Sequence, residues 1–229
     1  MINWLLRIFW LVVLLGIVGT AVRSLPPEHN PIADLSMDDP IGITTEMKLA
    51  RFAHEPDACF AYLDRSEIAY TRLDDSPEGE NCGFYDALTL DRSELPYSGT
   101  LRMTCALTGA LATWERQGIL PRASEELASP PVRILTYGSY VCRRKYGRST
   151  GSFSEHATGN AVDIWGFELE NGQIISVKSH WGTDTAEGRF LKAVRNDACR
   201  LFGTVLGPEY NAAHADHFHF DMSFSGICR

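Results

Sequence analysis

Residues 154–167 read Ser-Glu-His-Ala-Thr-Gly-Asn-Ala-Val-Asp-Ile-Trp-Gly-Phe, and they place an acid inside an apolar run. Gly159 and Asn160 tolerate turn conformations, so a turn there would fold His156 back toward a strand that begins near Asn160. Asp163 would lie in that strand, between apolar neighbours. An unpaired buried carboxylate costs several kcal/mol, so Asp163 needs a metal ion or a buried salt bridge beside it, and the pattern favours the metal.

A second stretch rich in histidine, residues 214–221, reads His-Ala-Asp-His-Phe-His-Phe-Asp. Side chains at i and i+2 of a β-strand share one face. His217, His219 and Asp221 should therefore point the same way, while the two phenylalanines point to the other face and pack into the core. One strand thus offers two imidazoles as alternative ligands.

The two stretches together supply the ligands of a catalytic metal site. His156, Asp163 and one histidine of the second stretch make three nitrogen and oxygen ligands, and catalytic zinc sites leave the fourth position to water. The bound water is acidified and becomes a nucleophile near neutral pH. A base should accept its proton, and His214, Asp216 and His217 are all close enough in sequence to do so.

The overall charge argues against nucleic acid as a partner. The chain of 229 residues has a formal net charge of −8. No basic stripe is available to neutralise phosphates. We interpret the one basic cluster as a solvated loop; its members are Arg143, Arg144, Lys145 and Arg148.

The N-terminal residues 1–23 form a targeting segment. The apolar run from Ile8 to Val22 is extended toward the N-terminus by further apolar residues, to about the length that spans a bilayer. Trp4 and Trp10 resemble interfacial anchors, which favours an uncleaved membrane helix. The small residues at 19–21 leave cleavage as a signal peptide open, and in both cases the remainder is exported.

The cysteines fit an exported protein. An even number of widely spaced cysteines without a CxxC pair indicates three disulfides. Six cysteines allow 15 pairings. We expect the pairs Cys59–Cys82, Cys105–Cys142 and Cys199–Cys228.

The remaining pattern predicts an α+β domain. Residues 24–43 carry prolines and acids without a period and indicate a linker, and residues 44–229 then form one domain with a small antiparallel sheet and flanking helices. The expected helices are 44–64, 104–117 and 187–202. The expected strands are 86–90, 132–142, 160–167, 173–177 and 217–224, with a hairpin turn at 170–172.

The first motif, Ser-x-His-x-x-Gly-x-Ala-x-Asp, and the later Asp-His-x-His resemble those of the LAS group of zinc peptidases. These are D-alanyl-D-alanine carboxypeptidases and dipeptidases and the penicillin-insensitive murein endopeptidase, which cleave peptide crosslinks of the bacterial cell wall. The resemblance implies a LAS/hedgehog-like metallopeptidase core. It also implies one zinc ion on His156, Asp163 and His219.

The same resemblance implies catalytic and substrate-binding roles. In the carboxypeptidases the acid three residues before the last ligand is the general base, which here is Asp216. In the murein endopeptidase two earlier histidines assist, which here are His214 and His217. Arg143 would contact substrate or the developing oxyanion, with a structural ion pair as the alternative. Ser154 would face substrate or cap backbone groups.

Over a longer stretch, roughly residues 55–229, the chain resembles the bacterial extensin-like C-terminal domain. The matching segments are 138–143, 154–164, 204–208 and the closing Cys228-Arg229.

Three functions follow as hypotheses. The first is a zinc-dependent hydrolase of peptide bonds in peptidoglycan, either crosslinks or stem peptides, held at the bacterial inner membrane with its domain in the periplasm. The second is a metal-containing wall-binding module without hydrolysis, and the third a structural envelope protein without metal. Candidate bases beside all three ligands favour the first, because a binding module needs none.

Overall fold

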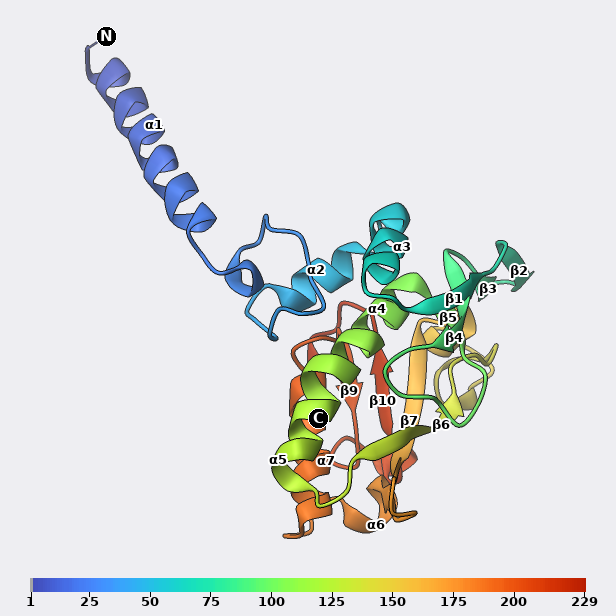
Figure 1. Cartoon of the computed structure of the whole chain (residues 1–229). Helices are drawn as coiled ribbons and strands as arrows, with labels where there is room; N and C mark the ends of the chain where they lie inside the picture. Colours follow the sequence, from blue (N-terminus) through green and yellow to red (C-terminus); the bar gives the residue numbers. More distant parts are fainter. Residues whose placement is uncertain (1) are drawn as a thin grey trace.

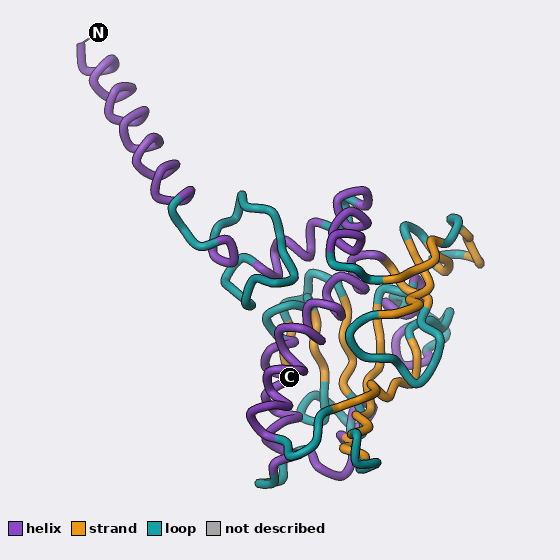
Figure 2. Tube along the Cα trace, in the orientation of Figure 1, coloured by secondary structure: helices purple, strands orange, loops and turns teal. Residues whose placement is uncertain are grey.

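The computed structural model describes residues 2–229 and shows an α+β protein, as the sequence predicts (Figures 1 and 2). The α-helices are α1 Ile2–Arg23, α2 Thr45–Arg51, α3 Pro56–Arg65, α4 Cys105–Trp114, α5 Leu120–Glu126, α6 Val177–His180 and α7 Ala186–Ala198. The strands are β1 Ala69–Arg72, β2 Ser76–Gly79, β3 Cys82–Phe84, β4 Ala87–Arg92, β5 Arg102–Thr104, β6 Pro131–Gly138, β7 Ala161–Leu169, β8 Ile174–Ser176, β9 Thr204–Leu206, β10 Phe218–Asp221 and β11 Ile227–Cys228.

The main sheet is built around β7. Its strand order is β11-β9-β10-β7-β6, and β8 pairs with the second half of β7. All of these pairs are antiparallel except β11 with β9. The expected hairpin at residues 170–172 is confirmed as the connection between β7 and β8.

Helices α4 and α7 pack against one face of this sheet and leave the other face open (Figure 1). Trp114 of α4 contacts Phe167 of β7 and Phe220 of β10, with ring centroids 6.1 and 5.1 Å apart. Its indole Nε1 donates to the carbonyl of Val194 in α7, at 2.8 Å. Alternate residues of β7, among them Asp163, face the open side of the sheet.

The expected helices differ from the structure at their ends, and the one expected at 187–202 is α7, which ends at Ala198. The helix expected at 44–64 is divided into α2 and α3, because Pro56 disfavours helical geometry at Glu55. The helix expected to end at Gln117 continues through a π-helical turn, η2 Glu115–Ile119, into α5. The wider turn changes the hydrogen-bond register just before Pro121, which has no N–H to donate.

Residues 24–43, expected to be a linker, lie against the domain. Leu35 and Met37 are buried with its core. Lys48 of α2 donates from Nζ to the carbonyl of Pro27, at 2.7 Å. Residues 24–43 are therefore part of the packed domain for much of their length, and the linker is shorter than the sequence predicts.

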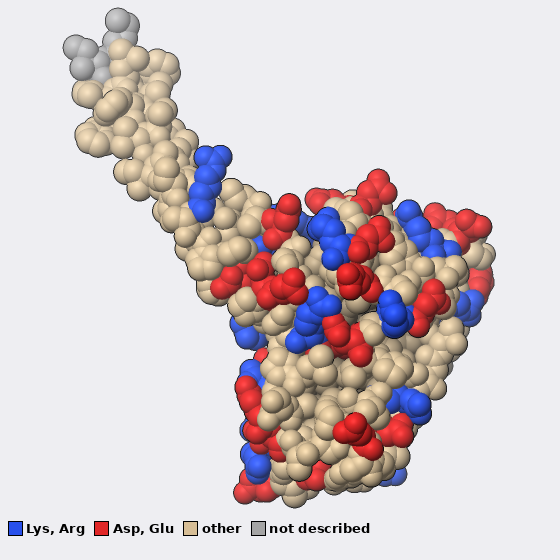
Figure 3. All heavy atoms as spheres, in the orientation of Figure 1, with Lys and Arg blue, Asp and Glu red and all other residues tan. Residues whose placement is uncertain are grey.

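Helix α1 projects away from the domain. Residues 3–23 have a mean hydropathy of 2.4 and none of them is buried in the domain, so the helix is long and apolar enough for a membrane span or a signal sequence. Figure 3 shows Lys, Arg, Asp and Glu spread over the domain and almost absent from α1.

The disulfides confirm three bridges but correct two of the expected pairs. Cys199–Cys228 is confirmed, and the other bridges are Cys59–Cys105 and Cys82–Cys142. Cys59 pairs with Cys105 because α3 packs against the start of α4. Cys82 then meets Cys142 because the β2–β3 hairpin lies against the loop that follows β6. The spacing of the cysteines along the chain predicts neither of these contacts.

Candidate metal centre

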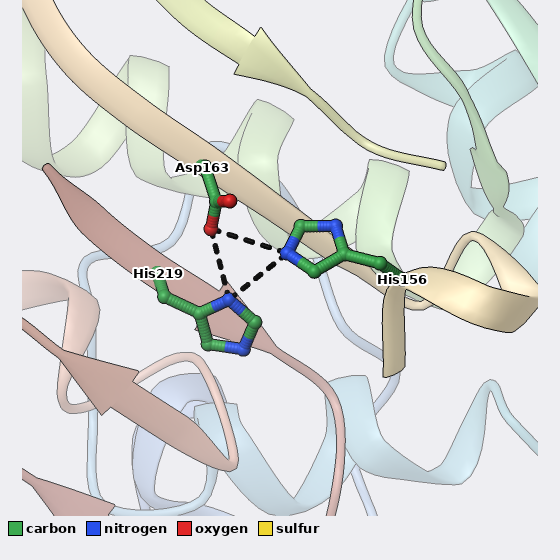
Figure 4. Close-up of side chains that lie close together, drawn as sticks. All are labelled: His156, Asp163 and His219. Carbon is green, nitrogen blue, oxygen red and sulfur yellow. Dashed lines mark hydrogen bonds and ion pairs between the residues drawn. The ribbon is translucent and has the colours of Figure 1, made fainter. Parts of the chain in front are cut away.

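Three side chains from separate elements meet on the open face of the sheet (Figure 4). Asp163 of β7 and His219 of β10 are direct partners in the strand register. His156 lies in the 3-10 helix η4, Glu155–Thr158, which ends at Gly159 in the left-handed conformation, with φ 65°. A glycine accepts this conformation without strain. The expected turn is therefore present, and it brings His156 to the strand.

The three facing atoms form a nearly regular triangle. His156 Nε2 is 3.1 Å from His219 Nδ1 and 3.2 Å from Asp163 Oδ1, and His219 Nδ1 is 2.9 Å from Asp163 Oδ1. Zinc bonds of ~2.0–2.1 Å to tetrahedral ligands place the ligand atoms ~3.3 Å apart. The side chains are thus within a few tenths of an ångström of the spacing that one zinc ion requires.

The outer hydrogen bonds determine which atoms face the centre without a proton. His156 Nδ1 donates to the carbonyl of Ser139, at 3.1 Å, and His219 Nε2 donates to Asp221 Oδ2, at 3.0 Å. Each neutral imidazole then presents a lone pair to the centre, beside the carboxylate oxygen of Asp163. Three acceptors facing one another require a cation, and metal-binding histidines ordinarily have such outer acceptors.

Protons take the place of that cation when no metal is bound. Burial alone would raise the pKa of Asp163, but hydrogen bonds from His156 and His219 hold it well below its usual range. Burial alone would lower the pKa of His219, yet hydrogen bonds to Asp163 and Asp221 raise it to about 9. The centre therefore attracts positive charge.

His217 lies beside the triad rather than in it. Its Nδ1 donates to Asp216 Oδ1, at 2.9 Å, and its Nε2 points at Asp163 Oδ1 from 3.6 Å. The hydrogen bond from His217 lowers the pKa of Asp216, which therefore stays ionised and orients the imidazole. His217 thus presents Nε2 to the centre, while Asp216 contacts the opposite nitrogen of the same ring, Nδ1.

His214 is held in the neutral form. Asn211 Oδ1 accepts from the backbone N–H of Ala213, so it also accepts from His214 Nδ1, at 2.8 Å. Burial and the neighbouring His219 and His217 lower the pKa of His214 to about 4. The ring centroid of His214 is 5.8 Å from that of His219, so the His214 ring lies next to the metal centre.

The triad lies in a cleft of about 460 Å³, and all the site residues expected from the sequence are in it or border it. Arg143 and Lys145 are exposed on its wall. Ser154 lines the cleft and also caps η4, since its Oγ accepts from the N–H of His156, at 3.4 Å.

Ser139 and Asp221 orient the two ligand histidines, and the sequence analysis gave neither of them this role. Ser139 acts through its backbone carbonyl, and every residue type has one, so the sequence could not predict this role. Asp221 had a signal: it is an acid two residues after His219 in a strand, which places both side chains on one face.

The fold and the site define an α+β domain with three disulfides and a His/Asp triad that lines a cleft. The chain belongs to the family described as extensin-like protein C-terminus, whose model matches residues 57–229. The match begins within α3 and covers the sheet, the cleft and every disulfide. Comparisons with curated proteins and with solved structures give no match.

Proposed function

We propose that this protein is a zinc-dependent hydrolase of peptide bonds in bacterial peptidoglycan. The observation that carries the proposal is the convergence of two ring nitrogens and one carboxylate oxygen, from His156, His219 and Asp163, each oriented by the fold. Two nitrogens and one oxygen at this spacing suit zinc, and they leave a fourth position toward the cleft. The sequence motifs shared with LAS peptidases support the same reaction.

Bound zinc would supply a water acidified enough to act as a nucleophile near neutral pH. His217 would accept a proton through Nε2 as the general base, because this nitrogen faces the triad while Nδ1 donates to Asp216. Asp216 stabilises the resulting imidazolium. This assignment gives the general-base role to His217 and a positioning role to Asp216.

The walls of the cleft suit a peptide substrate that carries negative charge. Arg143 lies on the wall, where a guanidinium can bind a carboxylate or the oxygen of a tetrahedral intermediate. Lys145 adds a second positive charge close to it. Stem peptides of the cell wall carry carboxylates, so peptidoglycan is the partner that we propose for this cleft.

Helix α1 and the disulfides support a proposed location at the inner membrane. An exposed apolar helix and fully paired cysteines suit a protein anchored in the inner membrane with its domain in the oxidising periplasm. Carbonate extraction of membranes tests the anchor: a retained chain of full length supports it, whereas a soluble, shortened chain indicates a cleaved signal.

Two measurements test the proposed function. Metal analysis of protein purified without chelator should give about one zinc per chain for the wild type and for the control His54→Ala, and none for His156→Ala. Zinc-loaded wild type should release new amino termini from wall sacculi. His217→Ala should keep its zinc and lose this activity, because the residue lies beside the triad.

The outcomes separate three functions. A zinc-free wild type would refute the metal centre and leave a structural envelope protein. A zinc-loaded wild type that binds sacculi and leaves the muropeptides unchanged would indicate a metal-containing wall-binding module without hydrolysis.

A further inference from the structure

A pair of aromatic side chains, one exposed and one half-buried, borders the metal centre on the open face of the sheet. Tyr137 of β6 and Trp165 of β7 have ring centroids 6.2 Å apart and planes inclined by only 23°. Tyr137 is 60% exposed, and neither ring belongs to the hydrophobic core. Exposed large aromatic side chains placed together on a surface mark binding sites more often than isolated ones do.

A bulge in β6 orients the tyrosine. Thr136 pairs with Ile164 and Gly138 with Asp163, so β6 has one residue more than β7 at this point, and that residue is Tyr137. Bulges beside functional sites commonly redirect one side chain. Here the bulge places the tyrosine ring beside Trp165, on the same face as Asp163.

The pair adjoins the catalytic groups. Tyr137 packs edge-on against the ring of His217, with centroids 5.6 Å apart, and its hydroxyl donates to Asp216 at 3.5 Å. Trp165 follows Asp163 by two residues in β7 and shares its face. A ligand resting on the two rings would therefore lie beside the cleft and within reach of the triad.

Polar groups lie further along the same two strands. Arg133 and Glu168 are register partners on β6 and β7 and form an ion pair of 3.1 Å. Both side chains are partly exposed. Aromatic rings flanked by charged hydrogen-bonding groups suit a ligand that has apolar faces and hydroxyl groups around its edge.

We propose that Tyr137 and Trp165 form a saccharide-binding platform that takes the pyranose rings of wall glycan. The C–H groups on one face of a pyranose carry slight positive charge and pack against the negative face of an aromatic ring. Asp216 beside Tyr137, and the Arg133–Glu168 pair further along the same two strands, offer partners for sugar hydroxyls. The role in the reaction rests on the proposed function: a sugar on the platform holds its attached peptide over the triad.

An added peptide strand does not fit this position. The outer edge of β6 is already covered by the preceding loop, because Ser98 N donates to the carbonyl of Ile134 and Ile134 N donates to the carbonyl of Pro96. The two rings lie on the face of the sheet, where no backbone groups are free to pair. Recognition there must use side chains, as saccharide binding does.

Calorimetric titration tests the platform without any chemistry. The full chain, in detergent micelles, is titrated with a tetramer of β-1,4-linked N-acetylglucosamine. We expect saturable binding by wild type, about tenfold weaker binding by Trp165→Ala and by Tyr137→Ala, and recovery in part by Trp165→Phe. Tyr85→Ala is the matched control, since Tyr85 is 45% exposed on the turn between β3 and β4.

The results distinguish failure of the platform from failure of the proposed function. No saturable binding by wild type, or equal binding by wild type and both alanine variants, would overturn the platform. Binding that survives in zinc-free His156→Ala supports a platform independent of the metal, even where no hydrolysis is found. If wild type hydrolyses wall, Trp165→Ala should lose activity on sacculi and keep it on free stem peptide; equal losses on both would indicate a peptide subsite and refute the saccharide.

Discussion

Glu115 is a buried carboxyl group that should make the domain less stable as the pH rises. It accepts hydrogen bonds from Ser93 Oγ, the backbone N–H of Leu95 and Tyr97 Oη. Burial outweighs these bonds and raises its pKa from 4.5 to about 7. The folded state therefore keeps a proton that the unfolded state releases between pH 4.5 and 7, so the free energy of unfolding falls as pH increases through this range.

The size of this effect follows from the two pKa values. A difference of roughly 2.5 pKa units at ~1.36 kcal/mol each gives ~3 kcal/mol lost between pH 4.5 and pH 8. Glu115→Gln cannot ionise, so the difference in stability between variant and wild type should change by this amount in urea titrations at the two pH values. The control Glu170→Gln, on an exposed turn, should follow the wild type at both. A Glu115→Gln difference that is the same at pH 4.5 and pH 8 would refute the reasoning.

The other predictions concern the metal centre and its walls. Asp221→Asn should weaken zinc binding about 10- to 100-fold in chelator competition, because it weakens the outer hydrogen bond of His219; unchanged affinity would remove Asp221 from the site. Zinc affinity should rise about tenfold per pH unit up to about pH 9, since zinc must displace the proton of His219; a flat profile contradicts this. Replacing Cys82 and Cys142 by serine should lower the free energy of unfolding by about 4 kcal/mol in urea titrations, given the 60-residue separation, and no loss would show that the bridge is dispensable.

Local sequence patterns predicted most of the fold. The turn at 170–172 and the alternation after His217 were readable because hairpins and half-buried strands impose them on neighbouring residues. Element ends were less predictable: the helix expected to end at Gln117 continues through a π-helical turn past Pro121. Such adjustments depend on packing against the rest of the domain.

The candidate site was likewise predictable where it depends on local sequence and unpredictable where it depends on tertiary contacts. His156 and Asp163 were readable from one stretch, because a glycine turn and a buried acid are local features. The sequence left His217 and His219 as equivalent residues on one strand face. The structure separates them, since β10 begins only at Phe218 and His217 is turned toward Asp216. The roles of Ser139 and Tyr137 depend on tertiary contacts and on a bulge, which no spacing reveals.

The position of β10 has a consequence for the order in which this protein is made. The strand inserts between β9 and β7, two strands whose residues precede it in the chain, and it brings the last of the three candidate ligands. Synthesis runs from the N-terminus, so His156 and Asp163 are made well before His219. The centre can therefore assemble only after nearly all of the domain has been made, and a shorter nascent chain carries an incomplete site.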